Sequence, residues 1–136
     1  MEFQGREGKR RILAFLRTGG DLERALAILR RHHGEGSVHL AYALVAHGTI
    51  MRELRRGDVG RTEFEAAVRA LVPELGADHV YTLDVRANAA LGRALSGDAP
   101  GAATELDAVA QRFVAGGKPV LDKVSVYRAL AHRLSG

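Results

Sequence analysis

The sequence predicts an all-α fold, built as a stacked array of antiparallel helix pairs. The dipeptide Gly-Asp occurs three times at nearly regular intervals: Gly20-Asp21, Gly57-Asp58 and Gly97-Asp98. These intervals lie within the range of roughly 20–50 residues that is typical of repeat proteins. Apolar residues recur with the helical period on both sides of each dipeptide. No segment alternates convincingly with a period of two, so a sheet is not expected.

Seven helices are expected, and the first two lie around Gly20-Asp21. The first spans about 7–18, and a glycine pair at 19–20 ends it. Asp21 is expected to cap the second helix, because an aspartate there accepts hydrogen bonds from free backbone N–H groups. The second helix carries a stripe with i, i+3, i+4, i+7 spacing: Leu22, Ala25, Leu26 and Leu29. The glycine-containing segment 33–37 predicts a turn.

The third helix, about 37–56, is apolar on nearly all sides as far as Met51. A helix of this kind is buried on several sides, so we expect it at the centre of the fold. Gly57 should end it, with Asp58 in the next turn. The fourth helix, about 61–75, has an apolar stripe that begins at Phe64. Pro73 weakens its last turn.

The last three helices are bounded by capping and glycine signals. Asp78 is expected to cap the fifth helix, which ends before Ser96-Gly97. A turn follows at 98–101, and Pro100 lies near the first position of the sixth helix, where proline is tolerated. Gly116-Gly117 ends the sixth helix, and the seventh spans about 120–134.

The fourth repeat unit is incomplete. Leu95-Ser96-Gly97 recurs as Leu134-Ser135-Gly136, where the chain stops. A final unpaired helix is a common end cap of a repeat array. The alternative is that the chain is an excised part of a larger regulator. We expect one domain, 1–136, with units at about 7–33, 37–75 and 78–115 and a terminal helix at 120–135.

One stretch, from Leu75 to about Phe113, carries a more specific pattern: Leu75-Gly76-Ala77-Asp78-His79, Thr82-Leu83, Arg86, Asn88, Ala90 and Gly97-Asp98. It resembles a tetratricopeptide repeat (TPR) of the long-period form found in kinesin light chains and actinobacterial regulators. The usual proline after the histidine is Val80 here. The resemblance implies a right-handed superhelical array of about seven helices, in which the first helix of each pair lines a concave groove.

The resemblance also implies a non-catalytic adaptor that binds a protein or peptide on this groove. Arg86 and Asn88 would face the groove, with the asparagine on the peptide backbone. Tyr127 falls in the same column of the fourth unit, and His47 is a candidate polar lining residue in an apolar helix. The asparagine itself does not recur in the other units. Arg86 and Asn88 could equally form hydrogen bonds between helices that fix their stacking.

The positive charge of the chain is concentrated at its beginning. Residues 1–33 carry eight basic and four acidic groups, which equals the whole net charge of +4. A second hypothesis is therefore a regulatory or nucleic-acid-associated module whose phosphate contacts come from Arg6, Lys9, Arg10, Arg11 and Arg17. Aromatic residues are few, at 5%, and are not interleaved with these basic residues, which argues against base stacking. The simpler interpretation is a solvated helix face.

The seventh helix suggests self-association. Val124, Tyr127 and Leu134 would form an apolar patch if nothing covers them, and a homodimer is the state we expect in that case.

A third hypothesis is a small helical enzyme or ligand-binding protein with His47, Arg86 and Asn88 around a groove. A closed groove with a buried histidine–carboxylate pair would favour it. The sequence contains no nucleophile motif, phosphate-binding loop or metal-ligand spacing, so we expect no catalytic residue, metal or cofactor. There are no cysteines, no signal peptide and no apolar run long enough to cross a bilayer. These features predict a cytoplasmic protein without membrane contact.

Overall fold

The computed structural model describes residues 21–33, 38–54, 56–117 and 121–135, and these residues form helices and short turns only. Six helices follow one another: α2 (Leu22–His33), α3 (Val38–Glu53), α4 (Gly57–Leu75), α5 (Val80–Leu95), α6 (Ala99–Ala115) and α7 (Leu121–Ser135). The prediction of an all-α fold is confirmed for this part of the chain. The expected first helix, about 7–18, lies outside the described residues.

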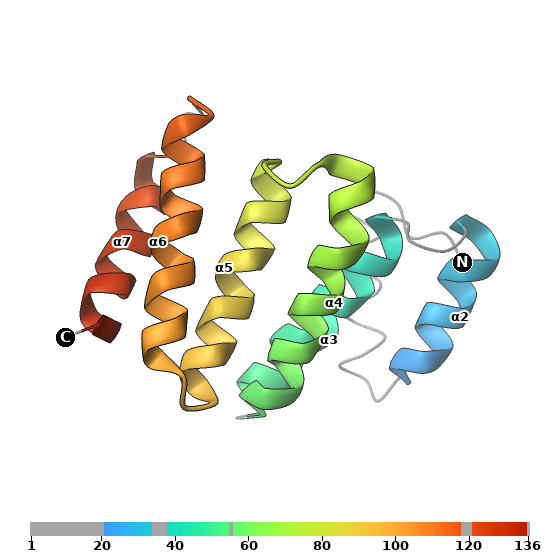
Figure 1. Cartoon of the computed structure of the whole chain (residues 1–136). Coiled ribbons are helices and arrows are strands. Elements are labelled where there is room, and N and C mark those ends of the chain that lie inside the picture. Colours follow the sequence, from blue (N-terminus) through green and yellow to red (C-terminus); the bar gives the residue numbers. More distant parts are fainter. Residues whose placement is uncertain (1–20, 34–37, 55, 118–120, 136) are drawn as a thin grey trace.

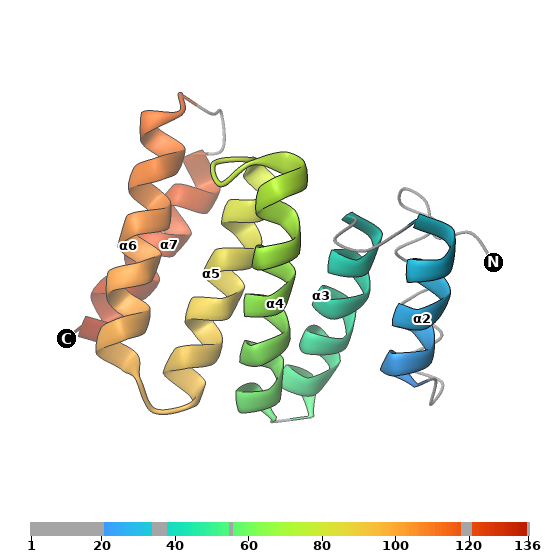
Figure 2. The same ribbon diagram turned by 45° about the vertical axis from the view of Figure 1, so that its right-hand side comes forward.

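Each helix packs mainly against its neighbours in the sequence. The array runs from α2 at one end to α7 at the other (Figures 1 and 2). In Figure 1, α4 and α6 lie towards the viewer, with α3 behind α4 and α7 behind α6. We call α3, α5 and α7 the A helices, and α2, α4 and α6 the B helices.

The core is divided into three clusters along the array. They lie between α2 and α3, among α3, α4 and α5, and among α5, α6 and α7. Helix α3 contributes to the first two, because Leu40 and Ala43 pack with α2 while Ala41 packs with α4. The prediction that this helix is buried on several sides is confirmed. A core divided in this way is what stacked repeats produce, since each unit contacts only its neighbours.

Glycines set the closest approaches between helices. A Cβ atom added to Gly60 of α4 would lie 2.8 Å from the carbonyl oxygen of Gly48 in α3. A Cβ atom added to Gly92 of α5 would lie 2.7 Å from the Cβ of Arg61 in α4. Both distances are shorter than a carbon contact allows, so these two crossings require glycine.

The capping prediction holds for α2 and fails for α5. Asp21 accepts a hydrogen bond from the backbone N–H of Glu23 at 2.8 Å, at the start of α2. The prediction for Asp78 is wrong. His79 caps α5 by accepting from the Tyr81 N–H at 3.0 Å, because the carboxylate of Asp78 instead pairs with Arg112 of α6 at 2.6 Å.

The predicted start of the fourth helix is also wrong. Helix α4 begins at Gly57, so Gly57-Asp58 forms part of its first turn instead of a turn before it. The carboxylate of Asp58 suits that position, because the N-terminus of a helix carries partial positive charge. By contrast, Gly97 adopts a φ of +102° beyond the end of α5. Asp98 then caps α6 from outside by accepting from the Gly101 N–H at 2.9 Å. The two dipeptides are therefore not structurally equivalent.

The number of residues between equivalent helices is not the same as the number between these two dipeptides. The A helices α3 and α5 begin at Val38 and Val80, the B helices α4 and α6 begin at Gly57 and Ala99, and the two offsets are equal. We call this offset the repeat period. It is slightly longer than the step from Gly57 to Gly97.

Side chains follow the same repeat period. The Thr62 and Thr104 hydroxyls each donate to the carbonyl oxygen four residues earlier. Glu63 and Glu105 come next in their helices. The repeat is thus visible in the segments 62–66 and 104–108, which share the pattern Thr-Glu-x-acidic-Ala.

Candidate functional site

Arg86 and Asn88 lie on opposite faces of α5, because two residues that are two positions apart are separated by about 200° around a helix. Arg86 donates to Glu105 Oε1 of α6, with its Nε at 2.9 Å. Asn88 Oδ1 accepts from Arg52 of α3 at 2.9 Å, and Asn88 Nδ2 donates to the Asp84 carbonyl at 2.9 Å. The structure does not bring the two predicted groove residues together. Both make hydrogen bonds between helices.

Tyr127 also links two A helices. Its hydroxyl donates to the carboxylate of Asp84, so α7 is tied to α5. Burial raises the pKa of the Tyr127 hydroxyl, and the hydrogen bond and negative charge of Asp84 raise it further. Tyr42 of α3 meets Tyr81 of α5 edge to face, with ring centroids 5.4 Å apart. Together with the Arg52–Asn88 bond, these contacts connect α3, α5 and α7 along one face.

His47 forms a largely buried pair with Glu63 of α4 through its Nδ1. Burial raises the pKa of the Glu63 carboxyl, while the hydrogen bond and charge of His47 oppose that shift. The second carboxylate oxygen, Oε2, is buried and has no hydrogen-bond partner among the described residues. The pair lies in the contact between α3 and α4, whereas Arg86 and Asn88 bond to other residues, Glu105 and Arg52. The sequence assigned Glu63 no role, because its spacing along α4 does not show that it lies opposite His47 of α3.

The expected self-association patch is covered. Val124 and Tyr127 are buried in the cluster formed by α5, α6 and α7, and Leu134 packs against that cluster. The seventh helix carries one apolar stripe, and α6 lies over it. The condition stated for self-association, that nothing covers this stripe, is therefore not met. The exposed residues of α7 are instead mostly polar or small: Ser125, Val126, Arg128, Ala129, His132, Arg133 and Ser135.

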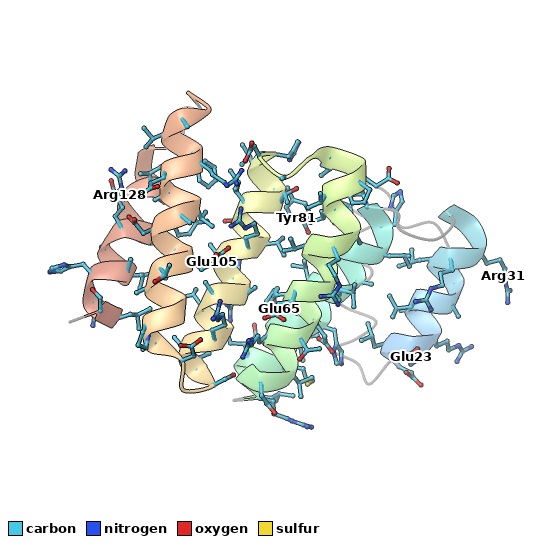
Figure 3. All side chains as sticks on the ribbon, in the orientation of Figure 1. Glu23, Arg31, Glu65, Tyr81, Glu105 and Arg128 are labelled. Carbon is cyan, nitrogen blue, oxygen red and sulfur yellow. The ribbon has the colours of Figure 1, made fainter. Side chains whose placement is uncertain are left out.

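A hollow of about 320 Å³ opens between α4, α5 and α6. Its apolar lining comes from Val68, Ala89 and Ala90, which are small enough to leave space beside α5. Its charged lining comes from Glu65, Arg69, Arg86, Arg93 and Glu105. Figure 3 shows Glu65 and Glu105 on either side of α5. We call this space the α5 hollow.

Most charges around the α5 hollow are paired. Arg61 binds Glu65 at 2.8 Å, Arg86 binds Glu105, and Arg93 binds Asp98 at 2.8 Å. The backbone N–H of Gly101, and then Arg93, lower the pKa of Asp98, which keeps this carboxylate ionised. Arg69 is exposed and has no acidic partner among the described residues. The hollow therefore combines an apolar floor with one surplus cation.

The remaining predicted residues of interest lie elsewhere. Arg6, Lys9, Arg10, Arg11 and Arg17 fall outside the described residues. Within the described ranges, no group of three or more His, Asp or Glu side chains could hold a metal ion. No described helix has both the length and the apolar character needed to cross a membrane.

Comparison of the chain with protein-family models, with curated proteins and with solved structures finds no match.

Proposed function

We propose that this chain is a non-catalytic interaction module, similar to a TPR array, which binds an acidic segment of a partner protein. In this proposal the helix pairs form a right-handed superhelix, and the segment 7–18 supplies a seventh helix. The sequential packing of α2 to α7 supports the proposal, because an array of this kind leaves long faces open to solvent.

The observation that carries the proposal is the surplus charge of Arg69 above the apolar floor of the α5 hollow. A glutamate side chain of a partner fits both features. Its methylene groups would cover Val68 and Ala89, and its carboxylate would reach Arg69. The volume, about 320 Å³, is at the lower end of the range of about 300–1,000 Å³ for ligand pockets, so it suits one or two side chains of a peptide.

The α5 hollow is a better candidate than the face along α3, α5 and α7. On that face Asn88 and Tyr127 are already engaged by Arg52 and Asp84. A peptide that used Asn88 would have to replace hydrogen bonds that connect the helices. Arg69 can bind a carboxylate without breaking a bond among the described residues.

Selection from a random peptide display library against the immobilised chain tests this function. We expect the selected peptides to be enriched in Glu and Asp. Arg69→Glu should weaken their binding by about tenfold or more, because hydrogen bonds between charged groups contribute about 1.5–3 kcal/mol. Arg31→Glu, an equally exposed change on α2, is the matched control and should bind normally. Selected peptides without acidic enrichment, or equal binding to Arg69→Glu, would rule the proposal out.

A further inference from the structure

A second hollow, of about 360 Å³, lies between α6 and α7, the last two described helices. Its α7 lining residues are Arg128, Ala131, His132 and Ser135. Each lies one repeat period after a lining residue of the α5 hollow: Arg86, Ala89, Ala90 and Arg93. On the α6 side, Asp107 lies one repeat period after Glu65. The two hollows are therefore the same feature in successive repeats, and we call the second one the α7 hollow.

The packing of α7 follows the same equivalence. Tyr127 and Ala131 of α7 are buried against α6. Their equivalents one repeat period earlier, Val85 and Ala89 of α5, are buried against α4. The stripe of α5 that packs with α6 consists of Leu83, Ala87 and Ala90. Its equivalents on α7 are Ser125, Ala129 and His132, and all three are exposed.

The α7 hollow thus has two walls where the α5 hollow has three. The third wall of the α5 hollow is α6, whose Glu105 accepts hydrogen bonds from Arg86. Arg128, the equivalent of Arg86, is exposed and has no ion pair within the described ranges. The geometry points to an acidic amphipathic helix of a partner protein, which binds on the exposed face of α7 as α6 binds on α5 and places a carboxylate against Arg128.

Charge favours an acidic partner over a second copy that docks through its α2. The exposed face of α7 carries Arg128, His132 and Arg133. At the opposite end of the described helices, α2 and its cap expose three arginines (Arg24, Arg30 and Arg31) against two acidic residues (Asp21 and Glu23), so this end is also net positive. Figure 3 shows Arg31 and Arg128 at the two ends of the molecule. Contact between these ends would place like charges together. The smaller or polar residues Ser125, Ala129 and His132 suit a face that is exposed when the partner is absent.

The α6 segment itself provides a probe, because it already carries the required glutamate. A fluorescent, end-blocked peptide of residues 98–115 would be titrated against the full chain by anisotropy at low salt. We expect saturable binding that weakens at least tenfold with Arg128→Glu in the chain or with Glu105→Gln in the peptide. Circular dichroism would confirm that the Arg128→Glu chain remains folded, as expected for an exposed position.

A charge exchange identifies the contact directly. The Glu105→Lys peptide should bind the Arg128→Glu chain more tightly than it binds the unmodified chain. Arg31→Glu is the control chain and should bind the unmodified peptide normally. If the peptide instead replaces the chain's own α6 against α5, Arg128→Glu will not change its affinity, and the proposal is wrong. It is equally wrong if no binding occurs at millimolar peptide, since α7 would then be a solvated end of the array. The α5 hollow and its test with Arg69→Glu are independent of either result.

Discussion

Glu63 and Glu105 occupy equivalent positions in two successive B helices, yet they bind different cations in different surroundings. Glu63 is buried and pairs with His47, whereas Glu105 is half-buried and pairs with Arg86 at the edge of the α5 hollow. One repeat therefore uses this carboxylate inside a helix contact, and the next uses it beside an accessible space.

Glu63→Gln should change how stability depends on pH. Burial raises the pKa of Glu63 above its ordinary value of 4.5, so the folded chain retains a proton that the unfolded chain has released. The free energy of unfolding should therefore fall as the pH rises from 4.5 through the raised pKa of Glu63. Urea unfolding at a series of pH values should show this fall in the wild type, and the Gln variant should lack it. Parallel pH profiles for the two proteins would contradict the assignment.

His47→Ala should destabilise the fold at neutral pH. The change leaves the buried carboxylate of Glu63 without its hydrogen-bond partner, and an unsatisfied buried group costs about 1–3 kcal/mol. Urea unfolding measures the loss. The double variant His47→Ala/Glu63→Gln should recover part of the lost stability, because the buried side chain at position 63 is then neutral. An additive double variant would show that the pair is not coupled.

Gly60→Ala should destabilise the contact between α3 and α4. Alanine normally stabilises a helix by about 1 kcal/mol relative to glycine. Here its Cβ would lie 2.8 Å from the Gly48 carbonyl oxygen, and overpacking of this kind costs about 1–3 kcal/mol. At Gly48 the nearest atoms are at 3.2–3.3 Å, so Gly48→Ala should cost less. The melting temperature should be highest for the wild type, lower for Gly48→Ala and lowest for Gly60→Ala. A stabilising effect at Gly60 would exclude such a close crossing.

Tyr127→Phe should cost about 1 kcal/mol, the typical net contribution of a hydrogen bond. The ring stays in the cluster, with its centroid 6.0 Å from that of Phe113, so only the bond to Asp84 is lost. Val126→Ala, at a neighbouring exposed position of α7, serves as the control and should change stability by less than about 0.5 kcal/mol. Equal effects of the two changes would show that the link between α5 and α7 contributes nothing.

Local sequence was sufficient to locate the six described helices approximately, although not every boundary. The apolar spacing from Leu22 to Leu29, the capping aspartate at 21 and the glycine that ends α5 at 97 all act over a few residues, and the structure bears them out. The repeat period was harder to determine, because Gly-Asp serves two different positions. The pattern Thr-Glu-x-acidic-Ala at 62–66 and 104–108 indicates the period better. Its middle residue, Phe64 or Leu106, is buried in each copy and so marks the same position in each B helix.

The site depended on contacts between helices that spacing along one helix cannot reveal. Sequence left open whether Arg86 and Asn88 line a groove or form hydrogen bonds between helices. The structure shows such bonds for both residues, to different neighbours, Glu105 and Arg52. Likewise, His47 could be identified as an unusual polar residue in α3, while its partner Glu63 lies on α4.

An all-α chain with repeated helix pairs follows from the sequence alone, because helix periodicity and capping are local properties. Which side chains are covered follows only from the way the helices pack. Helix α6 covers the apolar stripe of α7, while Arg69 and Arg128 remain accessible beside small residues. Burial and ion pairing depend on which helix lies opposite, and close crossings such as that of Gly48 with Gly60 set this arrangement.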